Sequence, residues 1–251
     1  MHKNELFLQA LKTMNTTMKA DIKEGKKWRY SNSGSKQAHT FPKARETGKR
    51  YTNCVLAVWW GLRLAGIPDK ALHWQGVKGK IAFKDEAAKK EALKYFDLIS
   101  TKGKTIKQLY DQNLLCDGDI LWGFSNMTHT CVYYGGKQSF DAGHKYCSGS
   151  GEGAAYKKWI GSLTYKSGKP SHILRLKDRS HYRVQAGAFT NLPEFNKNKA
   201  IIEKKGFPVA MVKEDNMYKI QLGYFSGKTN AKRFAEKVAK KGISVFVKEI
   251  S

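Results

Sequence analysis

The chain has 251 residues, an apolar fraction of 41% and an aromatic fraction of 12%, which exclude a disordered protein and allow one or two domains with packed cores. Its formal net charge of +25 predicts a partner dense in negative charge, such as nucleic acid, an anionic membrane surface or an anionic wall polymer. The four cysteines include no C-x-x-C pair and are too irregularly spaced for a disulfide scaffold, which favours a reduced compartment.

The N-terminal segment, MHKNELFLQALKTMNTT, lacks the features of a secretion signal. It has no continuous apolar stretch and no small-residue cleavage site. Leu6, Phe7 and Leu11 instead have the spacing of one helix face, which predicts a helix over residues 4–22. The longest uncharged apolar run, residues 54–62, is too short to span a bilayer. We therefore expect no export signal and no membrane span.

Residues 25–178 divide into a helical part followed by strands. Residues 25–50 are polar and basic and predict a long surface loop, and residues 54–65 form an apolar helix that ends before Gly66 and Pro68. A second helix is predicted over residues 85–99, and Thr105 caps a short third one. Strands are predicted over residues 119–124, 129–134, 138–141 and 172–177. This order is typical of an α+β fold.

An internal repeat occupies the end of the chain. The sequence YRVQAGAF at residues 182–189 recurs as YKIQLGYF at residues 218–225, an offset of 36 that also relates the two Lys-Lys-Gly sequences ending at Gly206 and Gly242. Each half predicts strand, helix and strand, so the two halves give a βαββαβ sheet covered by two helices. We expect two domains, residues 1–178 and residues 179–251.

Three residues fit the roles of a cysteine nucleophile and its partners. Asn53 is a favourable helix N-cap, which places Cys54 in the first turn, where free N–H groups and the helix dipole favour a thiolate and an oxyanion. His129 begins one predicted strand, and Asp141 ends the next after a Gly135-Gly136 turn. An antiparallel pairing brings these two side chains together, as base and orienting group.

Other interpretations remain open from the residues alone. Cys54 also suits inert packing, His129 a structural position and Asp141 a turn. His129, Cys131, His144 and Cys147 include two imidazoles and two thiols that could bind zinc, but the spacing is not that of a zinc knuckle, and we expect no metal and no cofactor. Tyr51 and His144 are candidates for the substrate cleft, although a solvated loop also explains His144.

Residues 45–178 resemble the NlpC-type cysteine peptidases and their CHAP relatives, which are papain-like cell-wall hydrolases. The resemblance lies in NCVLAVWWGLRLAGIP, DGDILWGF and HTCVYYGGKQSFDAGH. It implies a papain-like fold in which Cys54 is the nucleophile, His129 the base and Asp141 the orienting residue. The upstream tyrosine of many members has no clean counterpart, and Tyr51 is the nearest in sequence.

The repeat resembles the SPOR domain (sporulation-related repeat), a peptidoglycan-binding module, in YRVQAGAF, YKIQLGYF, KKGF and KKGI. The resemblance implies recognition of glycan strands. If one strand face packs on the helices, the opposite face displays Arg183, Gln185, Lys219 and Gln221, which suit hydrogen bonds to sugars. A merely solvated face is the alternative interpretation.

These features together predict a phage endolysin that cleaves an amide bond in the peptidoglycan of a Gram-positive host. The resemblance favours an endopeptidase acting after D-glutamate in the stem peptide, with an N-acetylmuramoyl-L-alanine amidase as the alternative. We expect synthesis in the host cytoplasm, holin-type release to the wall, and charge attraction to anionic wall polymers. A non-catalytic nucleic-acid-binding protein is the alternative of another class, but the repeat strands lack the stacking aromatics that it needs.

Overall fold

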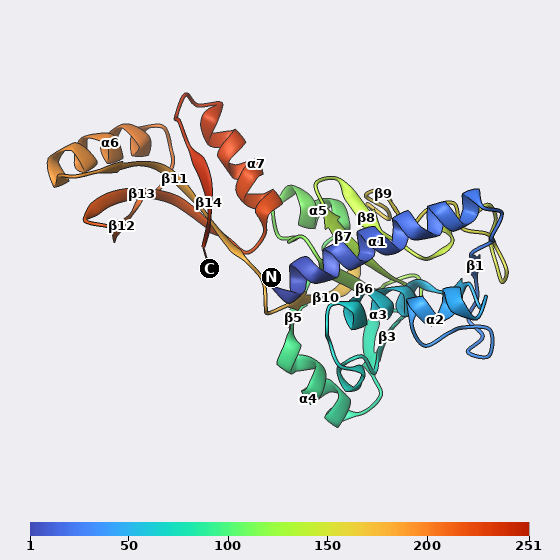
Figure 1. The fold of residues 1–251 in the computed structure, drawn as a ribbon. Coiled ribbons are helices and arrows are strands. Elements are labelled where there is room, and N and C mark those ends of the chain that lie inside the picture. Colours follow the sequence, from blue (N-terminus) through green and yellow to red (C-terminus); the bar gives the residue numbers. More distant parts are fainter. Residues whose placement is uncertain (251) are drawn as a thin grey trace. The chain divides into compact units, whose positions relative to one another are not determined.

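The computed structural model describes residues 1–250 and has two compact units, Met1–Arg179 and Ser180–Ser251. Both units combine helices with antiparallel sheet, so the α+β class is confirmed. Figure 1 shows the elements of each unit. Among the described residues, no helix has the length and apolar character needed to cross a membrane.

The helices of the first unit begin at recognisable caps. Side chains of Thr40, Asn53, Asp85 and Thr105 accept hydrogen bonds from the first turns of α2, α3, α4 and α5. The unit also contains two short 3₁₀ turns. The bounds are α1 Lys3–Lys23, α2 Phe41–Glu46, α3 Cys54–Leu64, η1 Asp69–Ala71, α4 Glu86–Tyr95, α5 Ile106–Asp111 and η2 His144–Tyr146.

A six-stranded antiparallel sheet has the order β5-β10-β6-β7-β8-β9. A parallel pair, β1 with β2, and a hairpin, β3 with β4, lie outside it. The bounds are β1 Arg29–Tyr30, β2 Tyr51–Thr52, β3 Trp74–Val77, β4 Lys80–Phe83, β5 Phe96–Ser100, β6 Asp119–Phe124, β7 Thr130–Gly135, β8 Gln138–Phe140, β9 Ile160–Ser162 and β10 Pro170–Leu176.

Three local predictions differ from the structure. The helix predicted over residues 85–99 ends at Tyr95, because Phe96–Ser100 pairs with β10 as an edge strand. Residues 25–50 are not all loop, since they contain β1 and α2. The β3–β4 hairpin and β9 were not predicted from the sequence.

The core of the first unit places α3 between α1 and the sheet. Helix α1 packs on α3, and α3 packs on β7 (Figure 1). Gly61 permits the close approach of the two helices, because a Cβ there would lie 2.7 Å from Leu11 Cδ2. Aromatic rings of Trp28, Trp60 and Trp159 fill the interior beside them. The start of α3 is thereby held on a rigid support.

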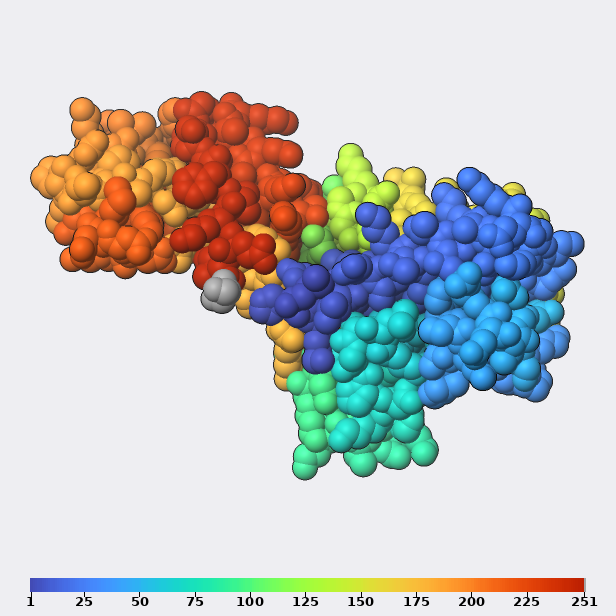
Figure 2. Space-filling view, viewed as in Figure 1, coloured from blue at the N-terminus to red at the C-terminus, as the bar shows by residue number. Residues whose placement is uncertain are grey.

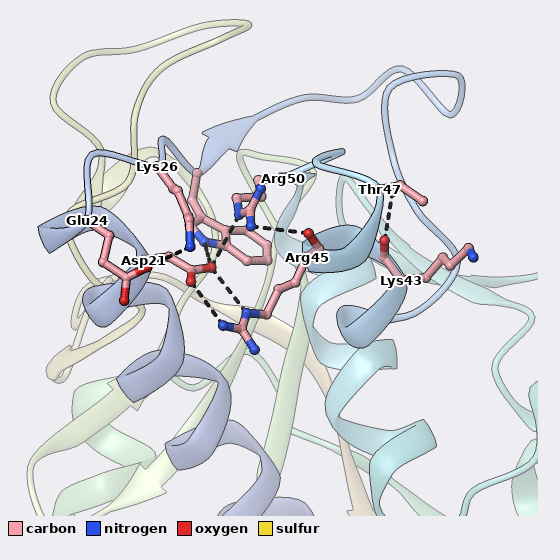
Figure 3. A network of polar contacts seen from close by, with 8 residues as sticks. Asp21, Glu24, Lys26, Lys43, Arg45, Thr47 and Arg50 are labelled. Atoms are coloured by element: carbon pink, nitrogen blue, oxygen red, sulfur yellow. Dashed lines mark hydrogen bonds and ion pairs between the residues drawn. The ribbon is translucent and has the colours of Figure 1, made fainter.

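A buried carboxylate ties α1 to the segment between α1 and α3. Asp21, which is 1% exposed, accepts hydrogen bonds from Trp28 Nε1 at 2.9 Å, Arg45 Nη2 at 3.1 Å and Arg50 Nε at 3.3 Å (Figure 3). These donors outweigh the effect of burial, so the pKa of Asp21 is lowered. In the space-filling view, α1 and this segment form one continuous surface (Figure 2).

The second unit has the βαββαβ order expected from the repeat. The sheet order β12-β13-β11-β14 places the first strands of the two halves in the centre. Helices α6 and α7 both pack on β11 and β13, with Val184, Ile220 and Val238 fully buried between them (Figure 1). The bounds are β11 His181–Phe189, α6 Leu192–Lys204, β12 Ala210–Glu214, β13 Met217–Phe225, α7 Lys228–Ala239 and β14 Phe246–Ile250.

Candidate active site

Cys54 occupies the first position of α3. Asn53 precedes it in an extended conformation, and its Oδ1 accepts hydrogen bonds from the N–H groups of Val55 at 3.1 Å and Leu56 at 2.9 Å. Cys54 is 7% exposed. The thiol therefore lies at the positive end of a helix that is anchored in the core, where the dipole favours an anion.

His129 lies beside both Cys54 and Asp141. Its Nε2 is 3.4 Å from Asp141 Oδ1, and Cys54 is close enough to affect the charge of its ring. Asp141 directly follows β8, which pairs antiparallel with β7, and His129 directly precedes β7. The structure thus brings the three residues together by the strand pairing that the sequence predicted. Asp141 is fully buried, and its Oδ1 also accepts the N–H of Gly143 at 2.7 Å.

The environment of His129 favours its protonated form. Burial alone lowers the pKa of the imidazole, but the neighbouring Asp141 carboxylate, followed by Cys54, outweighs burial and raises the pKa to about 10. A cationic imidazole between a thiolate and a carboxylate is the arrangement that a cysteine nucleophile needs. The same imidazolium is a proton donor for a leaving amine.

Burial favours the protonated form of the other three thiols. Burial raises the pKa of Cys116 and of Cys147 to about 12, and it raises the pKa of Cys131 well above the ordinary value for a thiol. All four cysteines are free thiols. Because a protonated thiol is a poor nucleophile, Cys54 is the residue suited to attack.

Two residues that the sequence did not single out pack against the imidazole. A Cβ on Gly143 would lie 2.6 Å from His129 Cε1, so only glycine fits there with this ring position. Tyr165 contacts the ring edge-on, with centroids 4.7 Å apart, and has a φ of 48°, which is unusual for a bulky residue. Such strain is common at functional sites. Burial, followed by the charge of Asp141, raises the pKa of Tyr165 well above its ordinary value.

The tyrosine beside the thiol is Tyr30 rather than Tyr51. Strand β1 pairs with β2 so that Tyr30 faces Thr52, two residues before Cys54. Burial raises the pKa of the Tyr30 hydroxyl, and the charge of Cys54 raises it further. Tyr51 pairs with Arg29 on the same small ladder. The parallel pairing of segments 21 residues apart gave no sequence signal, which is why Tyr30 was missed.

His144 lies beside Tyr30, outside the group of Cys54, His129 and Asp141. Its ring packs on Tyr30 with centroids 3.9 Å apart, and its Nε2 lies 3.1 Å from both the N and the O of Gly151. It is half-buried, so the solvated-loop interpretation of this residue does not describe it. Among residues 1–250, no group of three or more His, Cys, Asp or Glu side chains is arranged to hold a metal ion.

The four predicted glycan contacts lie on the sheet face of the second unit that is opposite its helices, but three of them are not displayed there. Arg183, Gln185 and Lys219 are only 8%, 4% and 7% exposed, and Gln221 is partly exposed. Arg183 and Lys219 are held by Glu214 at 2.7 and 3.0 Å, which buries their charges in ion pairs. Their expected exposure is therefore wrong, and their role in glycan binding stays a prediction.

An exposed aromatic ring lies on the same sheet face. Tyr224 pairs with Arg183 across β11 and β13 and is 56% exposed. Its ring stacks on His181, with centroids 5.2 Å apart and planes at 25°. A pair of flat rings beside cationic and amide groups suits a carbohydrate more directly than the buried arginine and lysine do.

Comparison with known proteins identifies the family of the second unit. Residues 178–249 match the model of the SPOR domain, and this part of the chain is a SPOR domain. Among solved structures, the chain is similar to the peptidoglycan-binding domain of the B. subtilis cell wall lytic enzyme CwlC, with 31% sequence identity and a TM-score of 0.28. The similarity covers 31% of this chain and 98% of that domain. No curated protein matches the chain.

Proposed function

We propose that the protein is a peptidoglycan hydrolase in which a papain-like cysteine peptidase precedes the SPOR domain. The observation that carries this proposal is the grouping of Cys54, at the start of a buried helix, with His129 and with Asp141, whose Oδ1 lies 3.4 Å from His129 Nε2. The SPOR domain supports a role at the cell wall, and the similar domain of CwlC is described as peptidoglycan-binding. A wall-binding module raises the effective concentration of the catalytic unit at an insoluble substrate.

The reaction proceeds through an acyl-enzyme. The Cys54 thiolate attacks the amide carbonyl, and the backbone N–H of Cys54, which the Asn53 cap does not engage, stabilises the oxyanion. The His129 imidazolium then gives its proton to the departing amine, so that the C–N bond breaks and a thioester remains. Neutral His129 next takes a proton from water, which attacks the thioester and releases the carboxylate product. Asp141 keeps the imidazole oriented and stabilises its charge.

The scissile bond in this proposal follows D-glutamate in the stem peptide, and the bond between N-acetylmuramic acid and L-alanine is the alternative. In both cases the enzyme acts as a phage endolysin that is released to a Gram-positive wall. The net charge of +25 supports attraction to anionic wall polymers. Neither choice of bond alters the roles of Cys54 and His129.

Digestion of purified Gram-positive peptidoglycan tests the proposal. Wild type should clear a cell-wall suspension, and mass spectrometry of the soluble fragments should show new amino termini that identify the cleaved bond. We expect Cys54→Ala and His129→Ala to lose at least about a thousandfold in rate. Cys116→Ala is the matched control, because it removes a thiol that neighbours Asp119 and not the trio, and it should clear at the wild-type rate. Equal clearing by Cys54→Ala and wild type would overturn the thiol mechanism.

A further inference from the structure

A cavity that the catalytic trio does not use lies between α3 and the β3–β4 hairpin. Its volume is about 310 Å³. Small-molecule sites span roughly 300–1,000 Å³, so this cavity suits one compact group and not an extended chain. Its walls are provided by three aromatic side chains and three polar ones, namely Trp59, Trp74, Phe83, His73, Gln75 and Lys84.

The aromatic walls offer flat apolar surface. Trp74 is 2% exposed and forms the floor, whereas Trp59 and Phe83 are partly exposed. The rings of Trp59 and Trp74 are perpendicular, with centroids 5.9 Å apart. The C–H groups of a pyranose ring pack against aromatic faces of this kind, while the hydroxyl groups at its rim remain free for hydrogen bonds.

The polar groups of the cavity are available to a ligand. His73, Gln75 and Lys84 are exposed at the cavity and supply hydrogen-bond donors and an amide oxygen. Together they match the hydroxyl groups and the acetamide of an N-acetylated sugar.

The cavity adjoins the catalytic residues through both of its walls. Trp59 follows Cys54 by five residues on α3, a rise of ~7.5 Å along the helix. Gly76 of β3 lies against the catalytic histidine, because a Cβ there would be 2.7 Å from the carbonyl oxygen of His129. A disaccharide that carries a stem peptide is longer than this axial rise, and the proposal below places its sugar in the cavity and its peptide at Cys54.

We propose that this cavity is a sugar subsite, which binds an N-acetylhexosamine ring of the glycan strand while Cys54 attacks the attached peptide. This subsite rests on the proposed function, because it concerns the peptidoglycan substrate of the proposed hydrolase and names the part of it that the first unit binds. It is independent of the SPOR domain, since all the lining residues, Ala82 included, belong to Met1–Arg179. Sugar binding here would select peptides still attached to glycan.

Tryptophan NMR of the full-length Cys54→Ala protein tests the subsite. All six tryptophans lie between residues 28 and 159, so their indole signals report on the first unit even while the SPOR domain binds sugar. The probe is soluble tri-N-acetylchitotriose, added to protein with ¹⁵N-labelled indole groups. We expect the Trp59 indole signal, assigned by its absence in Trp59→Phe, to move and saturate, while the signals of Trp28 and Trp159 in the core stay fixed.

Removing one wall should weaken this response. Phe83→Ala should raise the dissociation constant about tenfold, which corresponds to about 1.4 kcal/mol. Lys107→Ala, which changes a different cavity of the first unit, is the matched control and should titrate like Cys54→Ala alone. A Trp59 signal that stays fixed at millimolar chitotriose, or that moves only with a sugar-free stem peptide, would overturn the subsite.

Hydrolysis by wild type is measured separately, so that peptidase activity without a Trp59 response rejects the subsite alone. Conversely, a Trp59 response without activity rejects the peptidase and supports the subsite.

Discussion

The charge of His129 depends on a carboxylate that is fully buried beside it. Because a raised pKa favours the cation in the folded protein, the stability from this pair is complete below about pH 6.5 and is lost as pH rises through about 10. Asp141→Asn removes the anion while keeping the shape, so burial then lowers the pKa of His129. We expect the alkaline limb of the kcat/KM profile to move from near pH 10 to below neutrality.

A pH–rate series from pH 5 to 11 measures this shift. Asp111→Asn is the control, because Asp111 pairs with Lys107 at the surface and away from the trio. An alkaline limb that is the same in Asp141→Asn and wild type would mean that Asp141 is not the orienting residue, and His144 would become the next candidate. If kcat of Asp141→Asn falls by the same factor at every pH and the alkaline limb does not move, the imidazole is misplaced and its charge is unchanged.

Gly143 has a second effect on the same imidazole. A methyl group there would lie 2.6 Å from His129 Cε1 and 3.0 Å from Asp141 Oδ1, and both distances are too short for real contacts. Since Gly143 has a negative φ of −89°, the effect of Gly143→Ala is steric and not a backbone strain. We expect kcat to fall by about a hundredfold, as for displacements on the order of 1 Å.

The measurement compares turnover with the position of the His129 ring signals in an NMR spectrum. Gly149→Ala is the matched control, because a Cβ there meets nothing within 4 Å. Gly143→Ala should shift the His129 signals and keep the melting curve of a folded protein. Turnover equal to that of Gly149→Ala would show that the imidazole tolerates the methyl group.

The trio could be predicted because each member stands at the end of an element that the sequence marks. Asn53 marks the start of the helix, and the Gly135-Gly136 turn fixes which ends of two strands meet. Tyr30 and Tyr165 were not predictable in this way. Tyr30 depends on a two-residue parallel ladder, and Tyr165 depends on a left-handed residue in an irregular connection. Contacts of this kind are set by tertiary packing and not by periodicity.

The segment between α1 and α3 is held by Asp21 more than by its own secondary structure. Asp21→Ala would leave Trp28 Nε1 without a partner and two guanidinium groups without their shared anion. Since Arg45 can regain water, we expect a loss of about 2–3 kcal/mol in unfolding free energy. The lowered pKa of Asp21 means that its contribution is present above about pH 4 and is lost on acidification.

Urea unfolding followed by tryptophan fluorescence reports this change, because every tryptophan lies in the first unit. Glu24→Ala is the control, since Glu24 makes one exposed ion pair with Lys26 and should change stability by less than about 0.5 kcal/mol. If both variants unfold at the same urea concentration, the buried network contributes no net stability. Loss of activity without loss of stability would instead point to a shift of Tyr30.

Helices and strands were predictable where one apolar periodicity continued over the whole element. They were missed where the periodicity of a helix passed into that of a strand. The repeat fixed the C-terminal sheet order because two copies carry the same alternation. The helix predicted to residue 99 failed because Phe96–Ser100 continues an amphipathic pattern but pairs with β10. Tertiary pairing outweighed local helix preference there. The β3–β4 hairpin turns at Gly79, which has a φ of 75°. It was missed because the short basic sequence around the turn shows little alternation of apolar and polar residues.

Glu214 is the anion that balances the cationic face of the C-terminal sheet. Hydrogen bonds from Arg183 and then from Lys219 lower its pKa to about 2, so its stabilising effect is present above about pH 4.3 and is lost as pH falls through about 2. Glu214→Gln should lower the melting temperature of the SPOR domain at pH 7 and have little effect near pH 2. Amide NMR signals of β11 and β13 in the full chain follow this melting. Glu203→Gln, which removes a longer surface pair, is the control, and equal melting of the two variants at pH 7 would contradict the prediction.

Positive charge is spread over both units of the molecule. Residues 180–251 contain 14 Lys and Arg against 6 Asp and Glu, a net charge of +8, which leaves +17 on residues 1–179. The proposed attraction to an anionic wall therefore involves the whole chain, and we expect it to weaken as salt screens it. Specific contacts of the SPOR domain should be most visible at high ionic strength.

Tyr224 is the residue at which such a specific contact can be separated from charge. It is exposed on the sheet face opposite the helices and stacks on His181, and a ring against a sugar is insensitive to salt. We expect Tyr224→Ala to bind purified walls almost like wild type at low salt and about tenfold more weakly in 0.5 M NaCl. Hydrolysis of small soluble muropeptides should stay unchanged, because they need no tether.

Met211→Ala is the matched control for this experiment. Met211 is 54% exposed, but it pairs with Ile220, whose side chain is in the core, so it lies on the opposite face of the same sheet. Co-sedimentation with purified walls over a salt series measures both variants. Equal retention of the two variants at every salt concentration would show that charge alone holds the protein to the wall. A loss confined to Tyr224→Ala at high salt would place the glycan contact on the face that carries His181 and Arg183, because charge cannot then account for the difference.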